Sequence, residues 1–171
     1  MIVGFSGFAQ TGKDTAAEQF IQNGFVRIAF ADALKREVEK MLHTAGVRVD
    51  LINNEQDKKD WRDFLVYWGA KRREQSESYW VKRLIFSAAS RRLHLDMDNI
   101  VIPDVRYKNE VEWIEGHKGL VIRLHRPEHG PKNDEEEKSF QQIDKHCTLP
   151  QVNNDGTIEQ LKEAVWDLYE H

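Results

Sequence analysis

Short apolar runs alternate with amphipathic stretches along most of the chain. Apolar runs bounded by glycine or polar residues predict β-strands, here at 1–6, 25–31, 99–105, 119–125 and 150–154. Apolar side chains spaced three and four residues apart predict helices, here over 13–23, 32–45, 57–70, 77–94, 110–117 and 157–169. The sequence therefore predicts a chain that switches between strand and helix from one end to the other.

This alternation is typical of an α/β fold, with a central parallel sheet of about five strands flanked by helices on both faces. In such sheets, ligands bind beyond the carboxyl ends of the strands. The loops at those ends hold residues 7–15, Asp32, Asp104, Arg106 and Arg126. We expect these residues to share one edge of the sheet, with Asp32 also serving as the N-cap of the helix that follows it.

Composition limits the class of protein. The 171 residues are 40% apolar and 32% charged, as expected for one globular domain with a sizeable core. No apolar run approaches the roughly 20 residues that span a bilayer, so we expect no membrane segment. A net charge of −4 argues against nucleic-acid binding. The single cysteine, Cys147, excludes an internal disulfide and fits the reducing cytoplasm.

Charge is distributed unevenly. Residues 71–92 contain seven basic and two acidic side chains, a local excess of +5 that favours an anionic ligand. Residues 132–138, "KNDEEEK", carry the opposite bias. An acidic run of this kind is usually a solvated face or a mobile loop, and we expect one of these here.

The stretch "GFAQTGKDT" at residues 7–15 carries the most specific chemistry. Gly7, Gly12 and Lys13 match the phosphate-binding loop G-x-x-x-x-G-K, directly after a strand and at the start of a helix. Glycines let backbone N–H groups approach phosphate oxygens, the helix N-terminus favours anions, and Lys13 would reach the β and γ phosphates. The alternative is a glycine-rich turn that binds nothing, which the strand and helix context disfavours.

Asp14 stands where this motif normally has a serine or threonine that ligates Mg²⁺. Its carboxylate would keep an oxygen ligand for the metal, directly or through water, or would only stabilise the helix N-terminus. Asp104, at the end of the strand 99–105, is a second candidate metal ligand; the alternative is an N-cap for a helix over 105–117. Arg106 lies two residues further on and could bridge phosphates.

Several stretches together give the chain a family resemblance. They are "GFAQTGKDT", "FADALK", "WRDFLVYWGAKRREQSESYWVKRL", "IPDVRYKNEVEWI", "VIRLHRP" and "NNDGTIEQL", in this order. With these the chain resembles the phage-type deoxynucleoside monophosphate kinases, within the P-loop nucleoside monophosphate kinase group. The resemblance implies a three-layer P-loop kinase fold with a helical nucleotide-binding insertion over about 32–95 and a lid over about 127–150.

The same resemblance implies the activity and the residues that carry it. It implies transfer of the γ-phosphoryl group of ATP to a deoxynucleoside monophosphate, with Mg²⁺, in the cytoplasm, or the host cytoplasm if the gene is phage-encoded. Catalytic residues would be Lys13, Asp14 and Arg106, with Asp14 and Asp104 at the metal. ATP would contact Gly7, Ala9, Gln10, Thr11, Gly12, Lys13, Asp14, Thr15 and Arg126. The acceptor would contact Asp32, Lys35, Arg62, Arg72, Trp80, Arg106, Asn109 and Glu110.

The sequence departs from the family pattern at one position, and the role of its tryptophans is open. In "DKHCTLP", Leu149 occupies the position where the family pattern has an acid, so no role is assigned to His146. Trp61, Trp68 and Trp80 lie in the predicted acceptor region, but tryptophans are more often core residues than base-stacking ones.

Two other functions remain open from the sequence. One is a P-loop kinase of another phosphorylated metabolite, such as dephospho-coenzyme A or phosphomevalonate. The other is a regulatory module that binds ATP without acceptor-stimulated turnover, which the arginines beyond those needed for ATP disfavour. The sequence also leaves open the bases accepted, the choice between ribose and deoxyribose, and whether the chain forms a homodimer.

Overall fold

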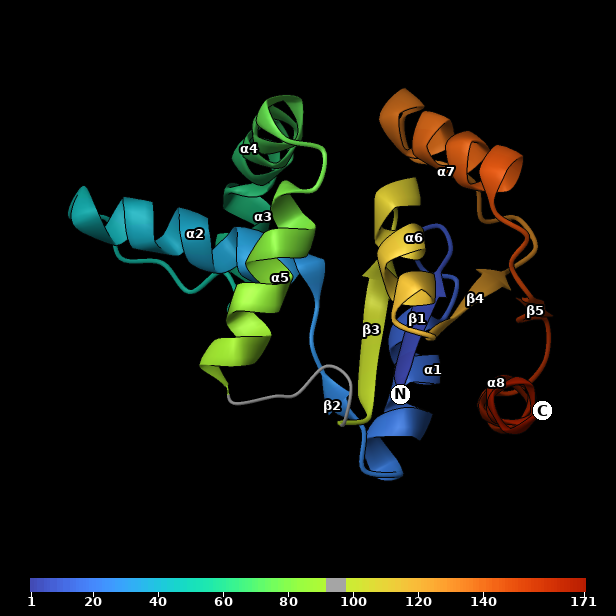
Figure 1. The fold of residues 1–171 in the computed structure, drawn as a ribbon. Helices are drawn as coiled ribbons and strands as arrows, with labels where there is room; N and C mark the ends of the chain where they lie inside the picture. Colours follow the sequence, from blue (N-terminus) through green and yellow to red (C-terminus); the bar gives the residue numbers. More distant parts are fainter. Residues whose placement is uncertain (92–97) are drawn as a thin grey trace. The chain divides into compact units, whose positions relative to one another are not determined.

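The computed structural model describes residues 1–91 and 98–171, which form two compact units. The first unit contains Met1–Ile28 and the chain from residue 98 onward, and the second is Ala29–Arg91 (Figure 1). The first unit carries all five strands, and the second is helical. In the part of the chain that the structure describes, no helix is both long and apolar enough to cross a membrane.

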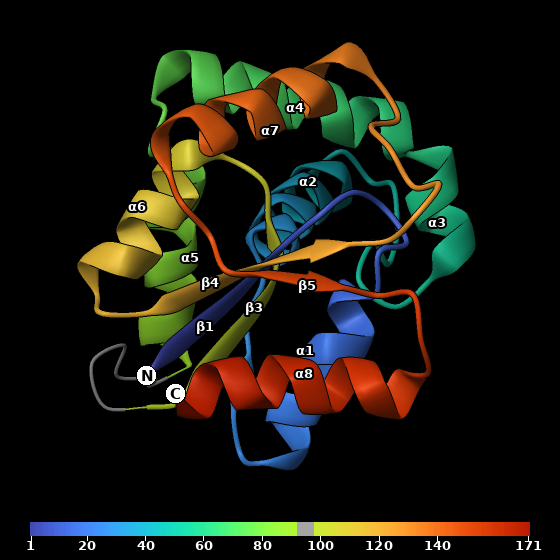
Figure 2. The ribbon, with the colours of Figure 1, turned by 90° about the vertical axis from the view of Figure 1, so that its right-hand side faces the viewer.

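A parallel sheet of five strands forms the centre of the first unit (Figure 2). Its order is β2-β3-β1-β4-β5, and all four neighbouring pairs are parallel. The strands are β1 (Ile2–Ser6), β2 (Val26–Arg27), β3 (Ile100–Val105), β4 (Leu120–His125) and β5 (Gln151–Asn153). All five residues of β1 are buried, as expected for a strand between two neighbours and two helical layers. The predicted five-stranded parallel sheet is confirmed.

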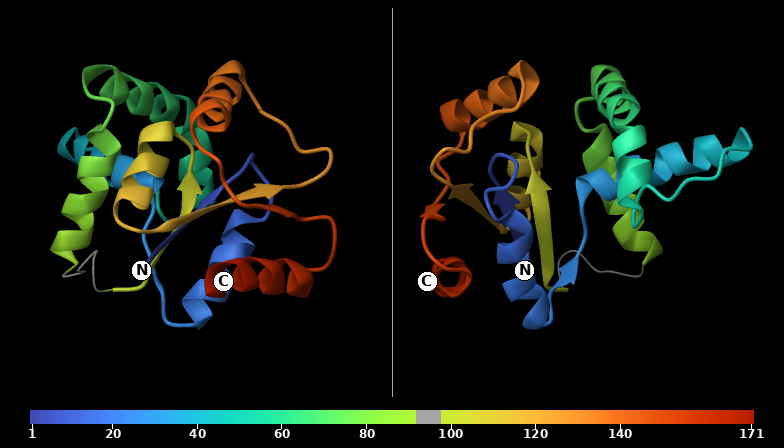
Figure 3. Two further views of the ribbon diagram at one scale, coloured as in Figure 1. Left: turned by 45° about the vertical axis from the view of Figure 1, so that its right-hand side comes forward. Right: turned by 180° about the vertical axis from the view of Figure 1, so that it is seen from behind.

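Helices cover both faces of this sheet (Figure 3). The helices of the first unit are α1 (Lys13–Gln22), α6 (Lys108–Gly116), α7 (Asp134–His146) and α8 (Ile158–Glu170). Side chains alternate along a strand, so Val3 and Phe5 enter the core with α1 and α8, while Gly4 faces the opposite side. There a Cβ on Gly4 would lie 2.8 Å from Ile114 of α6, so glycine lets this helix pack closely on the sheet.

The second unit is built from helices alone. They are α2 (Phe30–Thr44), α3 (Glu55–Asp60), α4 (Arg62–Gln75) and α5 (Tyr79–Ser90). Val38, Leu42 and Leu51 form a small buried core, and Trp61 and Trp68 are among the half-buried side chains packed against it. These two tryptophans are therefore packing residues.

Some predicted boundaries were wrong. The strand expected at 25–31 spans only Val26–Arg27, because the chain turns into α2 at Phe30. Asp32 is thus in the first turn of α2 and is not its N-cap, which is Ala29. The single helix expected over 57–70 is two helices that meet at Trp61. The last residues of the helix expected over 77–94 lie outside the described residues.

Two polar segments were expected with alternatives. For the acidic run, expected as a solvated face or mobile loop, the structure shows a solvated face: residues 134–137 form the first turn of the 13-residue helix α7 and are exposed except for the partly buried Glu136. Asn133 caps this helix by accepting a hydrogen bond from the Glu136 N–H, and acidic side chains in a first turn are stabilised by the helix dipole. The helix after β3 starts at Lys108 with Tyr107 as its N-cap, so Asp104 is a strand residue and caps no helix.

Candidate functional site

The loop between β1 and α1 has the backbone geometry of a tight anion-binding turn. Gly7 and Gly12 have φ values of 154° and 96°. A Cβ on Gly7 would lie 2.5 Å from the Leu124 carbonyl oxygen, and one on Gly12 would lie 2.5 Å from Asn154 Nδ2. Both positions therefore require glycine, for backbone conformation and for space. The loop ends directly at the N-terminus of α1, where unpaired N–H groups attract anions.

Side chains from distant parts of the first unit hold this loop in place. Asn154, just after β5, donates from Nδ2 to the Thr11 carbonyl oxygen at 3.0 Å, and its own N–H donates to the His125 carbonyl oxygen at 2.7 Å. Arg126, just after β4, donates from Nη1 to the Gln10 carbonyl oxygen at 3.4 Å. Within the loop, Thr11 Oγ1 donates to the Phe8 carbonyl oxygen at 2.9 Å. The carboxyl ends of β4 and β5 thus fix the loop backbone.

Lys13 folds back over this loop. Its Nζ donates to the carbonyl oxygens of Gly7 at 2.7 Å and Phe8 at 2.5 Å. Burial, followed by the positive charge of Arg106, lowers the pKa of Lys13 from 10.5 to about 8, although nearby carboxylates oppose this shift. The ammonium group is therefore poorly compensated, and an anion placed beside it would be strongly favoured.

Three carboxylates surround Lys13 closely enough to act on its pKa: Asp14, Glu136 and Asp104. Asp14 is exposed on the first turn of α1, and Asp104 is half-buried at the end of β3. In the described residues no three His, Cys, Asp or Glu side chains are grouped to hold a metal ion on their own. Mg²⁺ at phosphate sites usually takes one or two carboxylates plus substrate phosphates and water, so Asp14 with Asp104 fits this ion in the presence of a nucleotide.

The segment after β3 adds a cation and a buried acid. Arg106 Nη1 lies 3.9 Å from Glu136 Oε1 of α7, and the side chain of Glu136 is 9% exposed. Glu110 is buried, and its Oε2 accepts the N–H of Arg106 at 2.7 Å and the N–H of Tyr107 at 3.1 Å. Glu110 therefore fixes the backbone that carries Arg106. Asn109 lies on the first turn of α6.

The residues expected at the acceptor differ in their accessibility within the second unit. Trp80 is 3% exposed, and its Nε1 donates to the Gly69 carbonyl oxygen at 3.1 Å, so it is a core residue and we leave it out of the proposed acceptor site. Arg72 is half-buried and donates from Nε to Glu37 Oε1 at 2.8 Å. Arg62 is exposed at the start of α4. Arg92 of the basic segment lies outside the described residues.

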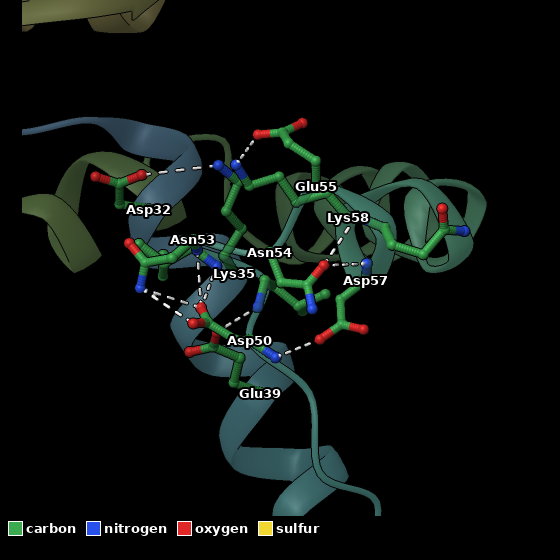
Figure 4. A network of polar contacts seen from close by, with 12 residues as sticks. Asp32, Lys35, Glu39, Asp50, Asn53, Asn54, Glu55, Asp57 and Lys58 are labelled. Carbon is green, nitrogen blue, oxygen red and sulfur yellow. Dashed lines mark hydrogen bonds and ion pairs between the residues drawn. The ribbon is translucent and has the colours of Figure 1, made fainter.

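Asp32 and Lys35 belong to a polar network at the start of α2 (Figure 4). Lys35 Nζ lies 3.8 Å from Asp32 Oδ1, and Lys58 pairs with Glu55 on α3. The hydrogen bond from Lys58 and its charge lower the pKa of Glu55, with a smaller contribution from Lys35. Lys35 therefore lies near the N-terminus of α3, between carboxylates of two helices.

The neighbouring turn is held by acidic side chains of the same network. Asp50 Oδ1 accepts the N–H groups of Ile52 at 3.1 Å and Asn53 at 2.8 Å (Figure 4). Glu39 Oε1 accepts the Leu51 N–H at 2.6 Å, which ties this turn to α2. These bonds hold the turn of residues 50–53 against α2.

The chain was compared with protein-family models and with known proteins. No protein-family model matches the chain. The chain is similar to an Acanthamoeba polyphaga mimivirus protein named "Putative deoxynucleotide monophosphate kinase", at 28% identity over 184 residues that cover 96% of this chain and 94% of that protein.

Two solved structures share the fold. One is the crystal structure of TT1252 from Thermus thermophilus, with a TM-score of 0.54, 16% identity and coverage of 99% of this chain and 96% of that one. The other is a sugar kinase from Janibacter sp. HTCC2649 in its unliganded form, with a TM-score of 0.52, 14% identity and coverage of 99% and 94%. The chain has a P-loop kinase fold. At these identities the likeness concerns the fold alone.

Three residues with a structural part in one or the other unit were not identified from the sequence. Asn154 lies in "NNDGTIEQL", whose position just after a predicted strand was a signal that could have revealed it. Glu136 was hidden in the acidic run, where nothing distinguishes it from its neighbours. Glu37 is one acid on an amphipathic helix, and its partners are 31 to 46 residues away in sequence.

Proposed function

We propose that this protein is a kinase that transfers the γ-phosphoryl group of ATP to a deoxynucleoside monophosphate, forming the diphosphate and ADP. The observation that carries the proposal is the loop of residues 7–12, which presents backbone N–H groups, a helix N-terminus and the poorly compensated Lys13 at one place. The similarity to the mimivirus protein supports the choice of a deoxynucleotide acceptor.

On this proposal the loop holds the donor. The β and γ phosphates replace the carbonyl oxygens of Gly7 and Phe8 as partners of Lys13 Nζ, and backbone N–H groups of Ala9 to Thr15 contact the remaining phosphate oxygens. Arg126, which already holds the Gln10 carbonyl oxygen, lies on the same side of the loop as a further donor-site cation. Asp14 and Asp104 hold the Mg²⁺ of the nucleotide complex, which supplies charge neutralisation at the transferring phosphoryl group.

Phosphoryl transfer of this type asks for positioning and charge stabilisation more than for covalent chemistry. Arg106 spreads the charge that develops on the transferring group, because its guanidinium can bridge two phosphoryl oxygens. Glu110 fixes the backbone of Arg106 and so limits the conformational entropy lost on binding. Lys13 stays charged when its ammonium is paired with phosphate.

Acceptor contacts are proposed for each unit by itself. Asp32, Lys35, Arg62 and Arg72 of the helical unit, with Arg106 and Asn109, are the proposed contacts. Residues 127–150, which include α7, are the proposed lid that excludes water during transfer.

A coupled assay of ADP release across all deoxy- and ribonucleoside monophosphates, with ATP and Mg²⁺, tests the proposal. We expect turnover that depends on a deoxynucleoside monophosphate and that is lost in Lys13→Ala, while Lys40→Ala on α2 retains it. Silence across the whole panel would contradict the proposal. Undiminished turnover by Lys13→Ala would remove the loop from the mechanism.

A further inference from the structure

One carboxylate organises the polar side of the helical unit. Glu37 of α2 accepts hydrogen bonds from Trp68 Nε1 at 3.0 Å, Arg72 Nε at 2.8 Å and Tyr79 Oη at 2.5 Å. Its Oε2 also lies 3.4 Å from Arg83 Nε. We call these five residues the Glu37 cluster. They join α2, α4 and α5 at a single carboxylate.

The charges of the Glu37 cluster do not balance. Burial raises the pKa of Glu37, but hydrogen bonds from Tyr79, Trp68 and Arg72 outweigh burial and hold that pKa below its usual value. The carboxylate is therefore ionised at neutral pH and faces two guanidinium groups. Arg83 Nε is buried against Glu37 as an ion pair at 3.4 Å, without a hydrogen bond among the described residues. Among the described residues, Glu37 is the acid that pairs with both arginines, which leaves one positive charge in excess.

Arg72 is held on several sides. Its guanidinium carbon lies 4.6 Å from the centre of the Trp68 ring and 5.0 Å from that of Tyr79, while Nη1 donates to Gln75 Oε1 at 3.1 Å. With Nε on Glu37, the plane of the group is fixed before any ligand arrives. The side chains of Arg72 and Arg83 stay 27% and 40% exposed, so both can still reach a ligand.

We propose that Glu37 is a positioning residue, which holds Arg72 and Arg83 as a paired, pre-oriented site for a phosphate monoester. This inference rests on the proposed function and names the place where the phosphate of the acceptor binds. A purely structural junction would need one arginine for one carboxylate. The second guanidinium and the remaining positive charge instead match a doubly charged phosphate. Fixing the arginines in advance lowers the entropy lost when that phosphate binds.

The test compares Glu37→Gln with a matched control, Glu74→Gln. Glutamine keeps the size of Glu37 and removes its charge, so Arg72 loses its ionic partner. Glu74 lies on the same unit and pairs with the exposed Lys71, so its substitution removes one negative charge without touching the cluster. We expect Glu37→Gln to raise the KM for the acceptor about tenfold, with the KM for ATP unchanged within about twofold. Glu74→Gln should change neither.

A double-mutant cycle separates positioning from stability. If Glu37 acts through Arg72, Glu37→Gln should raise the acceptor KM little further in an Arg72→Ala background. Thermal melting of each variant measures the structural contribution. A lowered melting temperature with an unchanged acceptor KM at 20 °C below the melting transition would overturn the inference, and so would additive effects in the cycle.

Equilibrium binding separates this inference from the proposed function. The probes are the four common deoxynucleoside monophosphates, added by calorimetry to the chain saturated with a non-hydrolysable ATP analogue. Monophosphate binding by the unsubstituted chain that is weakened in Glu37→Gln, without turnover, would support the inference and contradict the kinase proposal. Equal binding by both chains would overturn the inference alone, and no binding by the unsubstituted chain would overturn both.

Discussion

Lys13 links the chemistry of the loop to pH. Burial, and then Arg106, lower the pKa of Lys13 to about 8 in the absence of a ligand. Phosphate beside the ammonium would raise this pKa again. Between pH 8 and the usual pKa of 10.5, the free protein has a neutral Lys13 whereas the ATP complex has a charged one. Binding in this window therefore takes up a proton.

We predict that the affinity for ATP falls as pH rises through about 8, by up to about tenfold per unit. The affinity falls with rising pH because the neutral amine must be protonated before it can pair with phosphate. Calorimetric titrations in buffers of different ionisation enthalpy measure the proton uptake directly. Lys13→Arg serves as the control, because arginine stays protonated in this range. Equal binding heats in all buffers at pH 8.5 would contradict the prediction.

Asp14 distinguishes this loop from the common motif. We predict that Asp14→Ser, which restores the usual hydroxyl, raises the Mg²⁺ concentration needed for half-maximal turnover, because a charged ligand becomes a neutral one. A titration of Mg²⁺ at fixed ATP measures the shift. Asp63→Ser is the control, since this acid lies on the first turn of α4. Activity with an unchanged Mg²⁺ dependence would reduce Asp14 to a helix-stabilising residue.

The residues of the loop could be predicted because their spacing is local. Gly7, Gly12 and Lys13 lie within seven positions, and each carries a backbone or charge requirement that few residues meet. The partners of Asn154 and Glu37 could not be predicted, although the position of Asn154 just after a predicted strand was a signal for this residue. Asn154 meets the loop across 143 positions, and Glu37 meets Arg72 across 35. Such contacts depend on tertiary packing, which a pattern of residue types does not encode.

At the scale of elements, α7 is the helix that sequence composition defined least. Four acidic side chains in its first turn resemble a solvated loop in composition, yet the Asn133 cap and the buried Phe140 and Ile143 make the segment a packed helix. Phe140 lies 4.5 Å from Phe8, ring centre to ring centre, and stacks under Arg123 at 4.6 Å. Through this packing α7 lies against the loop of residues 7–12, and Glu136 lies near Arg106.

We predict that Glu136→Gln increases the affinity for ATP about threefold to tenfold at low salt. The reason is that Glu136 holds a half-buried negative charge beside Arg106 and near Lys13, where phosphate would bind. Calorimetry at low and high salt measures the change. Glu137→Gln is a close control, because Glu137 is on the same turn and its side chain accepts a hydrogen bond from the exposed Gln141. Equal gains in both variants would show a general charge effect instead.

At the scale of the whole molecule, the strand and helix alternation was enough to predict the parallel sheet and its five strands. It was not enough to predict boundaries at Phe30 and Trp61, where a helix starts without a polar side-chain cap. The order of the strands also could not be read from the pattern, because it depends on which strands form hydrogen bonds with one another along their edges. The structure places β1 between β3 and β4. The loop of residues 7–12, which follows β1, therefore lies at the middle of the edge formed by the carboxyl ends of the strands.

The contact between Asn154 and Thr11, which are far apart in the sequence, gives a prediction at this scale. We predict that Asn154→Ala weakens ATP binding about threefold to tenfold, because the Thr11 carbonyl oxygen loses its donor and the loop becomes less ordered. Gln151→Ala is the control, since its exposed side chain donates a hydrogen bond to Asn153, away from the loop. Calorimetry measures affinity, and hydrogen exchange of residues 7–13 measures loop order. Unchanged exchange with unchanged affinity would contradict the prediction.

The central position of β1 in the sheet has a consequence for folding during synthesis. β1 is made before both of its neighbours in the sheet, and the residue that holds its loop, Asn154, follows later still. A growing chain on the ribosome must therefore keep this apolar strand unpaired until β3 and β4 have emerged. The loop of residues 7–12 gains its contact with Asn154 only after β5 has been made, so the ordered form of this loop is a late product of synthesis.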